Sequence, residues 1–244
     1  MSFQSPKKAY DFYHGEVILM NKPLKWTSFQ VVNKLKWLIK QHPSLNINGQ
    51  KVKPKIGHAG TLDPLATGLL IICTGKKTKE IEQYQAKEKE YTGTFYLGAT
   101  TPCFDLEKEI DFHYPTGHIT NELILHTAEG FEGIQMQTPP IYSAVKVNGQ
   151  RAYDLARRGE EPEIKAKEIE IKEFEITRID LPQIDFRIVC SKGTYIRSLA
   201  RDFGLKLNSG AHLSALCRTR IGEFQLINAT DIEGFTESLG SCKV

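Results

Sequence analysis

The stretch from Lys55 to Leu70, KIGHAGTLDPLATGLL, places one histidine and one aspartate among small residues. Its glycines leave the backbone free to take positive φ angles or to approach another chain closely. Pro64 fixes its own φ and biases Asp63 toward an extended backbone, so the Asp63 carboxylate is presented rigidly. A loop built for contact, with a firmly held carboxylate and His58 nearby, suits a reacting group.

Asp63 and His58 also have structural interpretations. An aspartate before a proline is typical of a helix N-cap, but residues 65–68 and the apolar run 69–73 predict a turn and a short buried strand. His58 can be a hydrogen-bonded loop histidine. Its neighbours in the sequence supply no further metal ligands, so we expect no metal site.

Composition describes an ordinary globular chain of 244 residues, 40% hydrophobic and 25% charged, with a formal charge of +3. No apolar run reaches the roughly 20 residues of a membrane span, and the first residues lack the apolar core of a signal peptide, so we expect a cytoplasmic protein. Five scattered cysteines without CxxC spacing predict reduced thiols. Lysines on both sides of the loop either steer a phosphate backbone toward it or form a solvated face. They are Lys51, Lys53, Lys55, Lys76, Lys77 and Lys79.

The run GHAGTLDPLATGLL resembles the signature loop of the TruB family of tRNA pseudouridine synthases. Resemblance to that family continues, in the family's order, over residues 17 to 224. The other matching segments are the Lys22-Pro23 pair, the Lys89-Glu90-Tyr91 run, residues 137–159, KGTYIR at 192–197 and GAHLSALCRTRIGEF at 210–224.

The resemblance implies the parts of an active site. Asp63 is the catalytic carboxylate, and Arg197 pairs with it. Tyr91 stacks on the target base and is a candidate acid or base for the C5 proton. Tyr195 lines the uracil pocket, and Leu216 touches the target base.

Further residues would bind or support the RNA. His58 would occupy or prop open the space that the target base vacates, and Lys22 would support the active site. Asp105 would contact RNA or organise its loop, although Cys103 replaces a threonine that the family commonly has there. Residues 137–159 would form a thumb-like element that closes over the RNA stem-loop. Its residues suited to phosphates include Lys146, Arg157 and Arg158.

Each assignment has a structural alternative. Tyr91 lies on the same side of the predicted strand as Phe95 and Leu97 and can be a core residue, and Leu216 can be an ordinary core leucine. Arg197 can bind phosphate or form a surface ion pair. Asp105 can simply form a turn.

Periodicity predicts an α+β fold, a mixed and mainly antiparallel sheet flanked by helices. In the family this is the pseudouridine synthase fold, with an RNA cleft across the sheet. We expect one catalytic domain over residues 1–244 without the C-terminal PUA domain of many relatives. The predicted strands are 17–20, 69–73, 90–97, 168–179, 184–190 and 213–218, with a bulge between Ile171 and Phe174. One predicted helix begins at Thr27 or Ser28. The other predicted helices cover 78–84, 120–129, 153–158 and 196–203, and Gly204 closes the last of them.

The function implied by the resemblance is isomerisation of uridine to pseudouridine in the T arm of tRNA, at position 55. The reaction needs no cofactor, and we expect a monomer without an obligatory protein partner. One alternative is a guide-RNA-dependent synthase, and another is a non-catalytic RNA-binding or RNA-folding protein with a structural Asp63.

Overall fold

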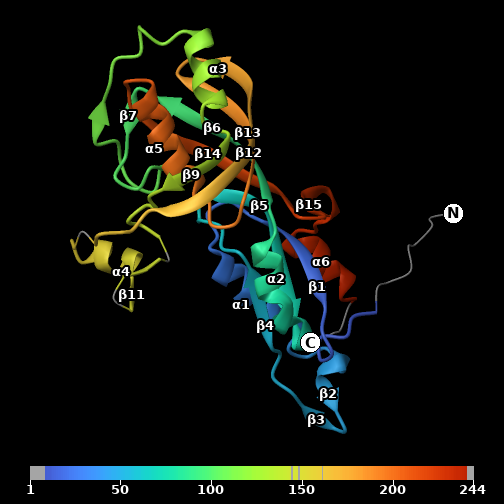
Figure 1. The fold of residues 1–244 in the computed structure, drawn as a ribbon. Helices are drawn as coiled ribbons and strands as arrows, with labels where there is room; N and C mark the ends of the chain where they lie inside the picture. The colour runs from blue at the N-terminus through green and yellow to red at the C-terminus, as the bar shows by residue number, and fades with distance from the viewer. Residues whose placement is uncertain (1–8, 144, 148, 161, 241–244) are drawn as a thin grey trace, which may run out of the picture. The chain divides into compact units, whose positions relative to one another are not determined.

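The computed structural model of the chain describes residues 9–143, 145–147, 149–160 and 162–240. The chain forms two compact units, and Figure 1 labels their elements. The first unit contains the described residues up to Lys87 and those from Cys217 onward, and the second contains Glu88–Leu216. The helix-flanked, mainly antiparallel sheet confirms the predicted α+β class.

The first unit is built around three strands in the order β1, β5 and β14, the last of which it shares with the second unit. β1 and β4 both pair antiparallel with residues 71–73 of β5, so they lie on its opposite edges. The elements are β1 (Val17–Lys22), α1 (Ser28–Ile39), η1 (Pro43–Leu45), β2 (Asn46–Ile47), β3 (Gln50–Lys51), β4 (Ile56–Ala59), β5 (Ala66–Thr74), η2 (Gly75–Glu80), α2 (Ile81–Ala86), β14 (Ala211–Ile221), β15 (Phe224–Gln225), η3 (Leu226–Asn228) and α6 (Ile232–Ser238).

β5 is buried on both faces, because successive side chains of a strand point in opposite directions. Leu70 and Ile72 pack into a core cluster with α1 and α6. Leu69, Ile71 and Cys73 pack into a second cluster with α2. This central strand therefore gives the loop that precedes it a fixed base.

α1 begins where the sequence predicts. The Thr27 hydroxyl accepts from the Gln30 amide at 3.1 Å, and the Gln30 side chain accepts from the Thr27 amide at 2.7 Å, so both partners of a capping box are present. Ser28 in the first turn is buried. The cap thus fixes the end of α1 that faces the Asp63 loop through Ser28.

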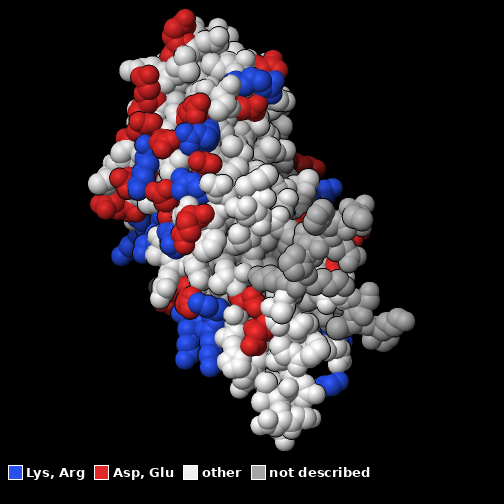
Figure 2. Space-filling view, turned by 90° about the vertical axis from the view of Figure 1, so that its right-hand side faces the viewer, with Lys and Arg blue, Asp and Glu red and all other residues white. Residues whose placement is uncertain are grey.

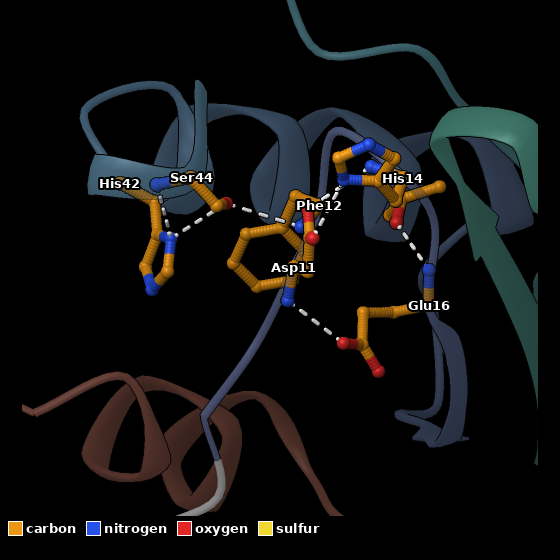
Figure 3. Close-up of polar contacts among 7 residues, drawn as sticks. Asp11, Phe12, His14, Glu16, His42 and Ser44 are labelled. Atoms are coloured by element: carbon orange, nitrogen blue, oxygen red, sulfur yellow. Dashed lines mark hydrogen bonds and ion pairs between the residues drawn. The ribbon is translucent and has the colours of Figure 1, made fainter. Parts of the chain in front are cut away.

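Side-chain contacts also fix the segment before β1 (Figure 3). The His14 amide donates to Asp11 Oδ1 at 3.0 Å, and the Phe12 amide donates to Ser44 Oγ at 3.1 Å. The Phe12 ring is buried and meets the His42 ring edge-on at 4.7 Å between centroids. Phe12 is thereby part of the core on the α1 side.

The second unit contains the strand order β14, β6, β13, β12 and β9. β6 pairs antiparallel with β13, β13 with β12, and β12 with β9. The register of β12 shifts between Ile171 and Glu173, as the predicted bulge requires. The remaining bounds are β6 (Lys89–Leu97), β7 (Ala99–Thr100), β8 (Phe112–His113), α3 (Asn121–Glu129), β9 (Gly133–Gln137), β10 (Lys146–Val147), β11 (Gln150–Arg151), α4 (Ala152–Arg157), β12 (Lys167–Asp180), β13 (Gln183–Cys190) and α5 (Ile196–Lys206).

The core of the second unit is a cluster of five phenylalanine rings. Their centroids lie 4.3 to 6.3 Å apart in tilted and edge-on arrangements, which suit aromatic quadrupoles. The rings are Phe95, Phe131, Phe174, Phe186 and Phe203. This cluster ties α5, which carries Arg197, to the sheet.

The predicted end of the helix at Gly204 is wrong, because α5 continues to Lys206. A Cβ on Gly204 would lie 2.4 Å from the Ala211 amide nitrogen and 2.7 Å from the Gly210 carbonyl carbon. The glycine therefore permits the backbone at the start of β14 to pack against the helix. A glycine near the end of a helical pattern usually indicates the end of the helix, whereas Gly204 is required for packing.

Gly204→Ala is expected to lower the free energy of unfolding by about 2 kcal/mol, because overpacking a backbone contact outweighs the better helix propensity of alanine. Urea unfolding measures the difference. The matched control is Gly117→Ala, since a Cβ there meets nothing within 4 Å and should change stability by less than about 0.5 kcal/mol. A Gly204→Ala protein as stable as the parent would contradict this packing argument.

Candidate active site

The loop between β4 and β5 carries Asp63 and is fixed by the segment that connects β1 to α1. The Leu62 amide donates to Ser28 Oγ at 2.9 Å, and Ser28 Oγ donates to the Leu62 carbonyl at 3.1 Å. The Lys25 amide donates to the Pro64 carbonyl at 2.8 Å. Within the described chain no helix begins directly after Asp63, because residues 64 and 65 form a turn and β5 starts at Ala66. The N-cap interpretation is therefore wrong.

Lys22, at the end of β1, is fully buried. Its Nζ donates to the carbonyls of Pro23 at 3.0 Å, Trp26 at 2.5 Å and Pro64 at 3.4 Å. Burial lowers the pKa of Lys22 to about 8, Asp63 opposes this shift, and Arg218 adds to it. The ammonium group is thus an internal cation beside the Asp63 loop. A direct substrate contact by Lys22 stays a prediction.

His58 lies in β4, opposite Ile72 of β5, and is half-buried. Burial, and next the Arg218 cation, hold its pKa below the usual range, while the Gly60 backbone acts in the opposite direction. Within the described part of the chain, the buried Nδ1 of His58 has no hydrogen-bond partner. The imidazole is therefore neutral at pH 7, which suits contact with a base more than contact with a phosphate.

Arg197 and Asp105 form a buried ion pair in the second unit, where each side chain is only about 5% exposed. Arg197 Nε lies 3.5 Å from Asp105 Oδ2. The guanidinium also donates to the carbonyls of Cys103 at 3.2 Å and Tyr142 at 3.0 Å. Its burial excludes the surface ion pair considered for Arg197. The predicted pairing of Arg197 with Asp63 stays a prediction.

Asp105 organises its own loop. Its carbonyl accepts from the Thr101 hydroxyl at 2.6 Å and from Cys103 Sγ at 3.3 Å, and its carboxylate accepts from the Glu107 amide at 3.0 Å. Cys103, which stands where the family commonly has threonine, thus still donates within this loop. A contact between Asp105 and RNA stays a prediction.

The three residues predicted to hold the uracil belong to the second unit. Tyr91 is buried on β6 opposite Ile188, and Leu216 is half-buried on β14. Tyr195 is the N-cap residue of α5. Gln137 fixes it by accepting from the Tyr195 amide at 2.8 Å and donating to the Tyr195 carbonyl at 3.2 Å.

The basic residues predicted for the thumb-like element share one cavity of about 620 Å³ in the second unit. Arg157 lies over the Tyr153 ring, 4.5 Å from its centroid, and Arg158 donates to Gln150 and Glu160 at 2.7 Å each. The lining residues are Lys146, Gly149, Gln150, Asp154, Arg157 and Arg158. Three basic side chains around an open hollow, with one acidic lining residue, can receive a phosphate group.

Charges on the neighbouring sheet have a different arrangement. Acidic and basic side chains are interspersed over the upper part of the face that Figure 2 shows. In β6, β12 and β13, Arg187 pairs with Glu90, Glu173 and Glu175, and Arg178 pairs with Asp180 and Asp185. Such mutual pairing leaves less positive charge for a polyanion than the thumb-like element offers.

Sequence reasoning missed Arg218 and Gln137. Both are buried polar residues that hydrogen-bond to backbone groups near predicted site residues. The feature of the sequence that could have indicated a contact with Arg218 was the pair of glycines, Gly60 and Gly68, in the loop that it contacts. Gln137 carried no local signal, because its partner Tyr195 is 58 residues away.

The described residues contain no group of three or more His, Cys, Asp or Glu that could hold a metal ion. Among them, helices with the length and apolar character needed to cross a membrane are absent.

Comparisons with known proteins agree with the sequence resemblance. A family model described as TruB family pseudouridylate synthase (N terminal domain) matches residues 46–196. A protein of Flavobacterium johnsoniae named tRNA pseudouridine synthase B is 59% identical, over 94% of this chain and 98% of that protein. A protein of the same name from Phocaeicola vulgatus is 56% identical, over 94% and 95%.

Solved structures show the same fold in larger chains. One, described as a Cbf5-Nop10-Gar1 complex, matches with a TM-score of 0.66 and 28% identity over 93% of this chain. Another, an H/ACA RNP bound to a substrate RNA containing 2'-deoxyuridine, matches with a TM-score of 0.65 and 25% identity. The chain spans only about 55% and 54% of those two solved chains.

Asp63→Asn is expected to lower the pKa of Lys22 below about 8, because the Asp63 charge raises that pKa. An NMR titration of lysine ¹³Cε signals measures the change, and Asp11→Asn, at an exposed site in the same unit, is the matched control. Lys22 has a pKa of about 8 in the folded protein and 10.5 in the unfolded chain, so the unfolded state binds more protons than the folded state between these pH values. The free energy of unfolding should therefore rise with pH across that window. An unchanged Lys22 pKa in Asp63→Asn would mean that the two side chains do not interact.

Proposed function

Because the chain belongs to the TruB family of pseudouridylate synthases, we propose that it converts uridine to pseudouridine in tRNA, at position 55 of the T arm, with Asp63 as the catalytic carboxylate. One observation carries the proposal. Asp63 lies on a fixed loop beside a fully buried ammonium group, in a chain 59% identical to a tRNA pseudouridine synthase B. The pseudouridine synthase fold is confirmed by the solved structures that share it, with TM-scores of 0.65 and 0.66.

The reaction breaks the bond between N1 of uracil and C1′ of ribose and joins C5 to C1′. The proton leaves C5 and N1 gains one, so the product is an isomer and needs no redox partner. A base in folded RNA must first leave its stack, which costs a few kcal/mol. Tyr91, Tyr195 and Leu216 would recover part of this cost by packing against the extruded base.

Asp63 has to be ionised in each route open to it. The carboxylate can attack C1′ of the ribose, attack C6 of the uracil, or assist departure of the base through a glycal. A nearby cation favours the ionised form. Lys22 supplies such a positive charge. The proposed contact with Arg197 would supply a second positive charge and a charge-assisted hydrogen bond. Tyr91 would act as acid or base on the C5 proton.

The two alternative functions have less support. The chain is 59% identical to its tRNA pseudouridine synthase B relative but only 28% identical to the matched chain of the Cbf5-Nop10-Gar1 complex. A free-standing tRNA enzyme, acting as a monomer without an obligatory protein partner, therefore fits better than a guide-RNA-dependent subunit. A non-catalytic RNA-binding protein would have no use for a buried ammonium group beside a rigid carboxylate.

Asp63→Asn and Asp63→Ala are expected to lower pseudouridine formation by about 10³-fold or more while tRNA affinity changes less than about threefold, because the carboxylate acts on the reacting atoms. The assay mixes purified protein alone with an unmodified tRNA transcript and maps pseudouridine. Two controls accompany it, the exposed Asp11→Asn and a transcript with cytidine at position 55. Turnover near the parent rate in Asp63→Ala would exclude the nucleophile role. Pseudouridine formed by the parent protein only at another uridine of the transcript would exclude position 55 as the target.

Alanine at Lys146, Arg157 or Arg158 is expected to weaken tRNA binding and to make the salt dependence shallower, by about 0.7 to 0.9 per lost phosphate contact. The rate at saturating protein should be kept. Filter binding between about 50 and 200 mM salt measures the slope. Lys172→Ala is the matched control, because Lys172 is exposed but pairs with Glu88 on the sheet. An unchanged slope would remove the substituted residue from the interface.

A further inference from the structure

Arg218, in β14, is one of the largest fully buried side chains of the described protein, with 1% of its surface exposed. A buried guanidinium is stable only when acceptors surround its donors. Nε donates to the Leu69 carbonyl at 2.8 Å, Nη2 to the Gly60 carbonyl at 3.0 Å, and Nη1 to the Thr61 carbonyl at 3.5 Å. These carbonyls lie on either side of Asp63 along the chain.

The loop backbone is shaped to approach this arginine. Gly68 has a φ of +102°, and a Cβ there would lie 2.4 Å from the Arg218 carbonyl oxygen and 2.7 Å from its nitrogen. Gly60 has a φ of +91°, and its Cβ would lie 3.4 Å from Arg218 Nη1. Glycine is the residue that tolerates both the conformation and the contact. Gly68 of the signature run thus makes room for the Arg218 backbone, and the positive φ of Gly60 favours glycine at the other end of the loop.

We propose that Arg218 is a positioning residue of the catalytic loop, whose planar guanidinium fixes the carbonyls of Gly60, Thr61 and Leu69 and thereby the backbone that presents Asp63. The proposal rests on the proposed role of Asp63. A guanidinium is suited to this task because its donors point in fixed directions, whereas an ammonium group is a point charge. A loop held at both ends can keep a carboxylate within the small displacement that catalysis tolerates.

The charge of Arg218 has a second effect. It lies close enough to His58 and Lys22 to lower the pKa of each, in addition to the larger effect of burial. Arg218 thus helps to keep the His58 imidazole neutral. This effect gives the proposal a readout that does not involve catalysis.

The test compares Arg218→Met, which removes the charge and the donors, with Arg218→Lys, which keeps the charge but loses the planar fork of guanidinium donors. Single-turnover rates at saturating protein and tRNA dissociation constants are measured for both. We expect Arg218→Met to lower the single-turnover rate of pseudouridine formation by about 100-fold, as a displaced catalytic group would. The dissociation constant for tRNA should change less than about threefold. Arg218→Lys should be intermediate. Arg220→Met, two residues along the same strand, is the matched control and should keep the parent rate.

The second measurement is an NMR titration of His58. Its pKa should rise in Arg218→Met and stay near the parent value in Arg218→Lys, because only the first loses the charge. This readout distinguishes the two proposals. If Asp63→Ala proved active while the His58 shift occurred, the role of Asp63 would fail and the contact of Arg218 with the loop would stand.

Three results would overturn the proposal. One is a folded Arg218→Met protein with a rate within threefold of the parent. Another is a loss confined to tRNA affinity, which would make Arg218 a binding residue. If Arg218→Met does not fold, Arg218→Lys decides, and a parent-like rate in that variant would show that the guanidinium fork is not needed.

Discussion

Buried cations that donate to backbone carbonyls fix the loop that carries Asp63. Lys22 binds the Pro64 carbonyl and Arg218 binds those of Gly60 and Thr61. A carbonyl is a neutral acceptor, so these contacts hold the backbone without neutralising either cation. Both cations therefore remain sources of positive potential at the loop. The same contacts that set the geometry of the loop thus also favour an ionised carboxylate on it.

The second unit holds its own charged group in a different way. Arg197 is compensated by the Asp105 carboxylate as well as by two carbonyls. Removing one partner of such a buried pair generally costs several kcal/mol, because the other charge is left in a medium of low polarity. Arg197 therefore has a fixed place before any substrate is bound. The Gln137 side chain fixes Tyr195 through the backbone amide and carbonyl of that residue.

Sequence patterns were sufficient for elements whose cause is local. The capping box at Thr27, the bulge after Ile171 and the buried strand after Asp63 follow from residue types a few positions apart. Gly204 was misinterpreted because its reason is a contact with Ala211, which belongs to another element. The candidate site residues came from the resemblance to a family. Their supporting partners depend on contacts distant in sequence.

Arg218 illustrates why this distance matters. Alternation along its strand places it with Ser214 and Leu216, which gives no reason to expect burial. Its three acceptors lie 149 to 158 residues earlier in the chain. The loop that Arg218 contacts does carry a sequence feature of this contact, its glycines, because positive φ at Gly60 and Gly68 is tolerated well only without a Cβ. Small residues in a signature loop therefore have two causes: one is room for a substrate, and the other is room for the strand whose arginine holds the loop. At Gly68 the close approach of the Arg218 backbone identifies the second cause.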